Sequence, residues 1–346
     1  MFWGADCHTK LWREMFFSNK YNDILVPAAE DTNNRLQDIN FSGRIGMWAS
    51  GYVKDYAMRL IDDNATSWRP LSPGAQRSIS PYLRNGALIA AYGGRYGVNF
   101  NINYIEKPGF YVLYSLMKSG LIPVVEPKDI LSISAWHGIK DIDQTYLEKC
   151  NNGHDLEKYS PDDDKNVVGN AGVQWCGAPV SDHDYSKIAL GVDYRWLNFL
   201  PKTPHGMVPI TDVDCFPKLQ KAGAETFVSD ICHGYIKGKK VSGEDFAKTM
   251  KMAVDKGAKK LFMTVDGAAW SLLRIDEKHA RLVLVDPGYV DPQERQVTIH
   301  FQNKAPLHAR NILTKEELVL NGMNAIKVSV PAGSMSFIDF EYDKID

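Results

Sequence analysis

The chain has 346 residues, of which 44% are hydrophobic and 24% charged, and this composition excludes a disordered tail, a collagen-like chain and a long coiled coil. Its 40 basic and 42 acidic side chains leave a net charge of −2, so the chain lacks the basic excess with which proteins bind nucleic acids. At roughly 150 residues per domain, the length predicts two domains or one large domain with an appendage.

The sequence shows no membrane segment, export signal or metal motif. No apolar run approaches the roughly 20 residues that span a bilayer, and the first residues lack the basic and apolar segments of a secretory signal. The five cysteines are widely spaced without CxxC, and the histidines lack the spacing of a metal site. We therefore expect no membrane partner, no metal and no cofactor.

The first hundred residues alternate short apolar runs with helical patterns. The runs cover residues 2–5, 24–29, 45–49 and 98–100, and each ends in polar or carboxylate residues. Helical spacing marks residues 9–18, 52–61 and 81–92. Buried parallel strands are continuously apolar, and their carboxyl ends carry the chemistry of (β/α) barrels. The pattern predicts about four strands, or half of a (β/α)8 TIM-type barrel.

The rest of the chain divides into a mixed region and a region of strands. Residues 151–166 are predicted to form an inserted polar loop, after which strands are expected at 188–194, 206–210, 226–231 and 261–265. A helix begins at the capping box of Ser242 and Asp245 and has Phe246, Met250 and Val254 on one face. After residue 266 only strands are expected, at 270–275, 280–285, 297–301, 325–330 and 336–341.

These patterns predict an α/β fold with three parts. Residues 1–125 would form the C-terminal half of a barrel, and residues 126–266 an α/β connecting region. Residues 267–346 would form an antiparallel β-sandwich.

Carboxylates gather at the expected ends of the early strands. A glycosidase needs two acids that flank the scissile bond, and the candidates here are Asp6, Glu30, Asp31, Asp55, Asp62 and Asp63. Any one of them is more commonly a helix cap or an ion-pair partner, but several at one rim favour a functional reading. Trp48 and Tyr52 could stack on sugar rings or simply pack in the core, and Arg44 could bind a carboxylate or sulfate or form an ordinary ion pair.

Several motifs together resemble a known family of glycosidases. Residues 46–52 read GMWASGY, followed by IDD at 61–63, Trp68, Arg77 and a segment 87–101 that ends in VNFN. This pattern resembles the second half of the catalytic barrel of glycoside hydrolase family 98. Segments 127–138 and 196–210 are similar to those that join that barrel to its β-sandwich, and VPAGS at 330–334 is similar to the closing strands of many barrel glycosidases. The resemblance implies an endo-acting, inverting enzyme on β-galactosides or xylan.

The resemblance also implies roles for single residues. Asp62 lies nearest the family's general base, with Asp63 a close rival, and a glutamate that assists the base would fall at Asn101. The asparagine there departs from the family and suggests a related polysaccharide hydrolase that resembles the λ-carrageenase group. The family's general acid lies on an earlier strand, so we expect this chain to pair with a missing half-barrel of the same protein. In the chain as given, Glu30 would be the acid or a subsite residue.

The leading hypothesis is an endo-acting glycoside hydrolase on a galactose-containing or sulfated polysaccharide. Asp62 would be the base, Glu30 or Asp63 a second acid, and Trp48, Tyr52, Asp6, Asp31, Asn101 and Arg44 would bind substrate. The full-length protein would be secreted or periplasmic. The alternative is a non-catalytic carbohydrate-binding or truncated accessory protein, and a weaker third option is a barrel isomerase or aldolase.

Overall fold

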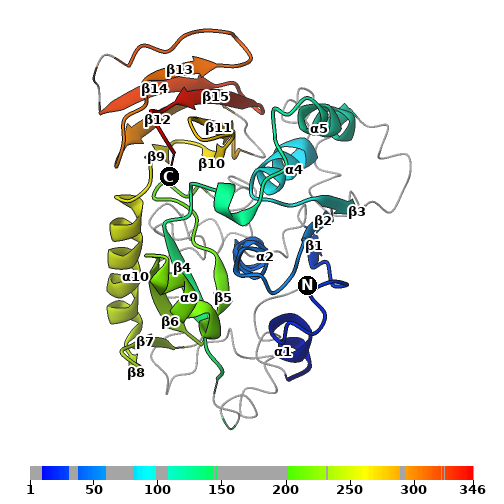
Figure 1. The fold of residues 1–346 in the computed structure, drawn as a ribbon, viewed down its shortest axis with the longest axis vertical. Helices are drawn as coiled ribbons and strands as arrows, with labels where there is room; N and C mark the ends of the chain where they lie inside the picture. The colour runs from blue at the N-terminus through cyan, green and yellow to red at the C-terminus, as the bar shows by residue number, and fades with distance from the viewer. Residues whose placement is uncertain are drawn as a thin grey trace, which may run out of the picture.

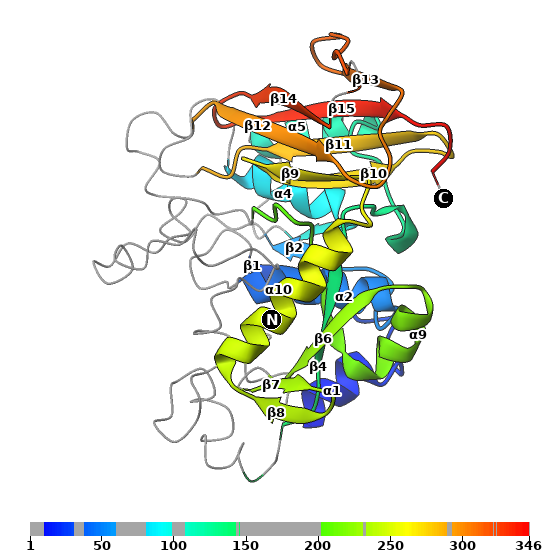
Figure 2. The same cartoon turned by 90° about the vertical axis from the view of Figure 1, so that its left-hand side faces the viewer.

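The computed structural model describes residues 10–30, 38–59, 81–98, 108–142, 145, 202–230, 233–288, 293–320, 322 and 324–345. The strands in these ranges form four sheets (Figure 1). Two antiparallel sheets from the C-terminal part of the chain lie over each other at one end of the molecule (Figure 2). Among the described residues no helix is long and apolar enough to cross a membrane.

A three-stranded parallel sheet is built from the N-terminal part of the chain. It has the order β1-β2-β3, with β1 at Ala28–Glu30, β2 at Ala57–Arg59 and β3 at Tyr96–Val98. Around it lie α1 (Lys10–Phe17), α4 (Pro81–Ala91) and α5 (Pro108–Lys118). The expected helices at 9–18 and 81–92 are confirmed, and the strands expected at 24–29 and 98–100 are present with shifted bounds. No closed barrel is formed by the described residues; the structure shows mixed sheets with few helices.

The apolar run at 45–49 is part of a helix, and the expected strand there was wrong. Helix α2 spans Asp38–Ser50 and lies between β1 and β5. Its residues from 41 to 48 are all buried, so its apolar residues do not form the one-sided stripe of a surface helix. A short apolar run fits a buried helix as well as a buried strand. At Gly46 a Cβ atom would overlap the carbonyl oxygen of Ile210, so the close approach of α2 to β5 requires glycine.

The helix expected at 52–61 was also wrong, because this segment contains β2. Tyr56, Ala57 and Met58 are all buried, as expected for the central strand of a parallel sheet that is covered on both faces.

A second sheet has the order β5-β4-β6-β7-β8. Its parallel strands are β4 (Ala135–Ile139), β5 (Ile210–Asp212) and β6 (Glu225–Ser229); β7 (Gly234–Ile236) and β8 (Lys239–Val241) form an antiparallel hairpin. The connections include α9 (Phe216–Lys221) and two 3-10 turns, η4 (Pro127–Asp129) and η8 (Val213–Cys215).

Helix α10, at Gly243–Ala258, runs from this hairpin toward the C-terminal sheets (Figure 1). Ser242 caps it by accepting a hydrogen bond from the Asp245 amide at 3.1 Å, as the sequence predicted. Phe246, Met250 and Val254 are buried on its inner face, which also matches the prediction. The strand expected at 188–194 and the polar loop at 151–166 lie outside the described residues.

The C-terminal strands form two antiparallel sheets around a common hydrophobic cluster. One sheet has the order β10-β11-β15-β13, with strands at Ala269–Arg274, His279–Val285, Met335–Glu341 and His308–Asn311. The other has the order β14-β12-β9, with strands at Ala325–Val330, Arg295–Phe301 and Met263–Asp266. The five strands expected here are present; β13 was not expected, and β9 pairs with β12 although the sequence suggested that it ends the α/β region.

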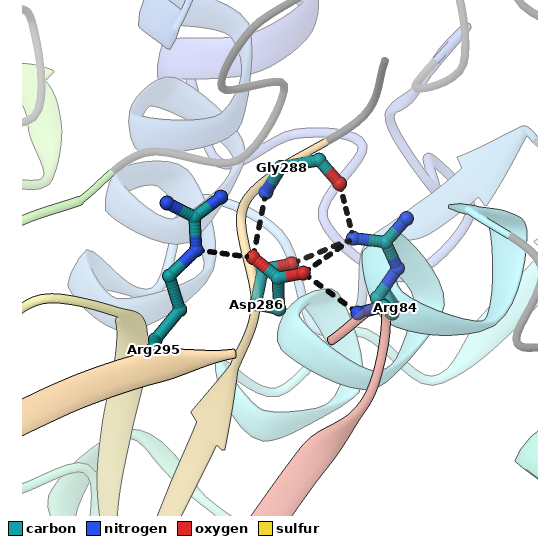
Figure 3. A network of polar contacts seen from close by, with 5 residues as sticks. Arg84, Asp286, Gly288 and Arg295 are labelled. Carbon is teal, nitrogen blue, oxygen red and sulfur yellow. Dashed lines mark hydrogen bonds and ion pairs between the residues drawn. The ribbon is translucent and has the colours of Figure 1, made fainter. Parts of the chain in front are cut away.

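Helix α4 is bonded to the C-terminal sheets by buried polar groups. The Tyr92 hydroxyl donates to the carbonyl oxygen of Trp270 at 2.7 Å, and the Ser271 hydroxyl donates to that of Ala91 at 2.9 Å. Farther along, the Arg84 guanidinium donates to the carbonyl oxygens of Asp286, at 2.9 Å, and of Gly288 (Figure 3).

The carboxylate of Asp286 is the centre of this contact (Figure 3). It accepts from the amides of Gly288 and Gly333 at 3.0 and 2.7 Å and from the Arg295 Nε at 2.7 Å. The side chains of Arg84 and Asp286 are both fully buried. A buried carboxylate needs such a complete set of donors, and here the set joins α4 to the loops of the C-terminal sheets.

Candidate active site

The carboxyl ends of β1, β2 and β3 lie at one edge of their sheet. Glu30 is in register with Arg59 and Arg59 with Val98, so the three strands end level with one another. Neighbouring strands are about 4.8 Å apart. The sequence therefore continues from this edge into Asp31 after β1, into Asp62 and Asp63 after β2, and into Asn101 after β3.

The structure describes only part of this predicted site. The backbone of Glu30 is placed at the end of β1, whereas Asp6, Asp31, Asp62, Asp63 and Asn101 lie outside the described residues. Their roles stay predictions. What the structure supplies is the parallel register, by which β1, β2 and β3 end level at one edge of the sheet.

Trp48 belongs to the core of the described structure. It is 3% exposed, and its ring lies 6.0 Å from that of Tyr56 in an edge-on arrangement. Residue 93 covers it so closely that a Cβ atom there would overlap the indole, and Gly93 also has a φ of +94°. Trp48 lies on the helix α2 and not at a strand end. Because it is buried there, its ring has no open face on which a sugar could stack.

Arg44 is also buried, at 1% exposure. Its guanidinium donates to the carbonyl oxygen of Ala57 at 2.6 Å and lies over the rings of Phe41 and Tyr56, at 6.0 and 5.8 Å from their centroids. These contacts hold α2 against the strand β2. The Arg44 side chain therefore stabilises the packing of α2 on β2 and is not open to a substrate.

Tyr52 is 7% exposed and lies close to the end of β5 in the second sheet. Its ring contacts that of Phe17 at a centroid distance of 4.9 Å. Burial raises the pKa of Tyr52, and the thiol of Cys215 and the charges of Asp212 and Asp214 raise it further. Tyr52 is thus a buried residue beside the acids that follow β5, and its predicted role in binding sugar stays a prediction.

A second group of acids lies at the carboxyl ends of β5, β4 and β6. Asp212, Ile139 and Ser229 are in register across these parallel strands, and Asp141 and Asp230 follow directly. The sequence analysis recognised the apolar runs at 206–210 and 226–231 but did not single out these acids. The signal that could have found them is the same one used for the N-terminal strands, a carboxylate at the end of an apolar run.

Asp212 is buried and bonded to Arg13 of α1. Arg13 also pairs with Asp141, its Nε lying 2.6 Å from Oδ1 of that residue. Burial raises the pKa of Asp212, although the amide of Asp214, 2.8 Å away, and the charge of Arg13 oppose this rise. Asp212 is only 1% exposed, so this acid is placed to hold α1 against the sheet.

Asp230 forms a second buried cluster. Its carboxylate accepts from the His233 amide at 2.6 Å and from the Tyr235 hydroxyl at 2.6 Å, and its Oδ2 lies 3.1 Å from Nδ1 of His233. Burial alone would raise the pKa of Asp230, but the hydrogen bonds and charge of His233 and the bond from Tyr235 outweigh it and lower the pKa. Asp230 therefore holds a negative charge that fixes Tyr235.

His137 is fully buried on the neighbouring strand. Its Nε2 lies 2.6 Å from the hydroxyl of Ser229, and burial lowers its pKa to about 3. It is neutral at any pH near 7 and is no proton donor there. Among the described residues, no group of three or more His, Cys, Asp or Glu side chains could hold a metal ion.

Comparison with known proteins finds family matches for both the N-terminal and the C-terminal part of the chain. Residues 1–240 match the family model "Lambda-carrageenase middle domain", and residues 264–341 match "Lambda-carrageenase C-terminal domain". Two λ-carrageenases, from Pseudoalteromonas carrageenovora and a second Pseudoalteromonas, are each 28% identical over 361 residues, covering 98% of this chain. The chain spans 38% of the length of these relatives.

Partial structural matches are found among solved glycoside hydrolases. An exo-carrageenase GH42 from Bacteroides ovatus is 10% identical with a TM-score of 0.44, covering 88% of this chain and 44% of its own. The catalytic module of a family 98 glycoside hydrolase from Streptococcus pneumoniae is 11% identical with a TM-score of 0.41, covering 95% of this chain and 70% of its own. Since the match to the middle-domain model covers more than half of the sequence, the chain belongs to the λ-carrageenase family.

Proposed function

We propose that this chain is part of an endo-acting glycoside hydrolase that cleaves a sulfated, galactose-containing polysaccharide with inversion. The observation that carries the proposal is the match of residues 1–240 to the middle domain of λ-carrageenase. The level carboxyl ends of β1, β2 and β3 support it, because acids that leave parallel strands at one edge can flank a single glycosidic bond. In the whole protein these strands would form part of a (β/α) barrel, and the protein would be secreted or periplasmic.

The proposed acids come from the end of β1 and from the part of the sequence that follows β2. Asp62, or Asp63 beside it, would remove a proton from the attacking water, and Glu30 would protonate the leaving oxygen or bind a neighbouring sugar. Inversion requires the two carboxyl groups to lie about 6.5–9.5 Å apart, with water between them. Asp6, Asp31 and Asn101 would line the same edge. Trp48 and Arg44 support the edge from below by packing α2 against β2.

The test uses the full-length protein and measures the reducing ends released from λ-carrageenan. Asp62→Asn should lower the rate by about 10²–10⁴-fold, which is the usual cost of removing a general base. Asp63→Asn is the matched control, and it should retain most activity if Asp62 is the base. Proton NMR of the first product anomer would show the stereochemical outcome.

Three outcomes would contradict parts of this proposal. Full activity in Asp62→Asn, with activity lost in Asp63→Asn, would transfer the role to Asp63. Full activity in both variants would remove the catalytic assignment. Binding of the polymer by the wild-type protein without any release of reducing ends would favour the non-catalytic, carbohydrate-binding alternative.

A further inference from the structure

The hairpin β7–β8 concentrates positive charge on its surface. Residues 234–241 read GYIKGKKV, with three lysines and no carboxylate, in a chain whose net charge is −2. Lys237, Lys239 and Lys240 are all exposed. The hairpin lies at the end of the molecule that is remote from the C-terminal sheets (Figures 1 and 2).

Two of these lysines, Lys237 and Lys239, have no carboxylate partner among the residues that the structure describes. Lys237 and Lys239 take part in no ion pair there, and neither does Lys140, at the end of β4. On the adjacent helix α10, by contrast, Lys251 lies 2.6 Å from Asp255, and Lys256 lies 3.0 Å from Glu225. Like charges held together without counter-charges repel one another, so an anion bound at the hairpin would relieve this repulsion.

The turn itself places a lysine where lysine is unfavourable. Ile236 pairs with Lys239, which leaves a two-residue loop of Lys237 and Gly238 with φ values of +49° and +78°. Two positive φ angles define a type I′ turn, in which Asn or Gly is preferred at the first position. A lysine there costs conformational energy that nothing in the hairpin's own packing requires, and such strain is a pointer to function.

An oriented aromatic ring lies beside these charges. The Tyr235 hydroxyl donates to the buried carboxylate of Asp230 at 2.6 Å, which fixes the ring. The Lys140 ammonium lies 4.2 Å from the ring centroid, and Lys240 pairs directly with Tyr235 across the hairpin. Tyr235 thus lies in the sheet between two positions that carry lysine. An oriented ring with an ammonium group beside it matches a sugar that carries anionic substituents.

We propose that Tyr235, with Lys140, Lys237, Lys239 and Lys240, forms a surface site for the sulfate groups of a polysaccharide chain, apart from the edge of β1-β2-β3. The site rests on the proposed function, since a sulfated substrate is what it would hold. Lysines on β8 also protect an edge strand from pairing with other chains. That role explains Lys239 and Lys240 but not Lys140, which follows the interior strand β4.

The experiment measures binding of the full-length protein to immobilised λ-carrageenan and to agarose, an unsulfated galactan, in 50 and 150 mM NaCl. Lys237→Gln/Lys239→Gln should raise the Kd for carrageenan about fivefold at the lower salt, corresponding to about 0.5 kcal/mol per exposed contact. Salt should weaken wild-type binding more than binding by the variant. Lys140→Gln and Tyr235→Leu should each weaken binding.

The matched control is Lys315→Gln/Lys327→Gln, which removes the same charge from exposed positions on the C-terminal sheets and also includes a lysine with positive φ, at +61°. An equal loss of affinity in both double variants would overturn the site in favour of a general charge effect. Unchanged binding in the hairpin variants would leave only the edge-protection role, and equally tight binding to agarose would exclude sulfate recognition. Hydrolysis of short oligosaccharides is measured separately, so loss of this site and loss of the proposed activity are distinguished.

Discussion

Replacing Asp286 with alanine should destabilise the protein strongly, although the residue lies far from the proposed active edge in sequence. The carboxylate is fully buried and lies 3.7 Å from the Arg84 Nη1, which is equally buried. Removing it also takes away the acceptor of the Gly288 and Gly333 amides. Arg295 is 24% exposed and can turn toward water, so its lost contact contributes little.

The magnitude follows from the charge that is left behind. Breaking a buried ion pair by removing one partner costs about 3–5 kcal/mol, because the remaining guanidinium stays out of water. The two orphaned amides belong to the same network, so their cost is not simply additive. We therefore expect a loss of about 4 kcal/mol in the free energy of unfolding, within the range for such a pair.

The assay is urea unfolding followed by tryptophan fluorescence. The matched control is Asp339→Ala, which breaks the pair of Asp339 with Arg281; these side chains are 28% and 13% exposed. That loss should be about 1 kcal/mol, because both charges keep contact with water. If Asp286→Ala is too unstable to purify, Asp286→Asn, which keeps one acceptor, should show a smaller loss of the same sign. Equal losses at positions 286 and 339 would refute the reasoning.

Two further predictions concern the buried elements. Gly46→Ala should lower the free energy of unfolding by about 1–3 kcal/mol as an overpacked site, because its Cβ would overlap the Ile210 carbonyl; Gly97→Ala, with no neighbour within 4 Å, is the control, and equal urea midpoints would contradict the packing of α2 on β5. The pKa of His137 falls from 6.5 to about 3 on folding. Between these values the unfolded chain binds a proton that the folded chain does not, so stability should fall as the pH falls below about 6.5, by about 1.4 kcal/mol per unit from this residue. His137→Gln should flatten the pH dependence by that amount in urea melts from pH 7 to pH 4.5, and an unchanged slope would show that burial does not hold His137 neutral.

The sequence predicted well those helices and strands whose pattern of apolar and polar residues matches their burial in the structure. Helix α10 begins at Ser242 as its capping box indicates, and the alternating strands β12 and β14 pair as half-buried antiparallel strands do. It failed at residues 45–49, because a helix that is enclosed by two sheets loses the polar face by which periodicity is recognised. It failed again at β2, whose three residues are too few to show a period.

The sequence could predict where the candidate site lies in the fold, but not which side chains are exposed there. The level ends of β1, β2 and β3 follow from parallel pairing, which polar residues after apolar runs already suggest. The burial of Arg44 and Trp48 could not be inferred, because it depends on how α2 packs against residues far along the chain. Asp212 and Asp230 were not predicted, although each follows an apolar run as the N-terminal acids do.

The bonds of Arg84, Tyr92 and Ala91 have a practical consequence for dividing this protein. The first family match ends at residue 240 and the second begins at residue 264, which invites expression of a shorter N-terminal fragment. A cut there would remove the carbonyl acceptors of Trp270, Asp286 and Gly288. The guanidinium of Arg84 would then lose its hydrogen-bond partners on the C-terminal sheets. Boundaries drawn from sequence alignment and units that fold by themselves need not coincide, and shuffled or truncated versions should keep the last eighty residues attached.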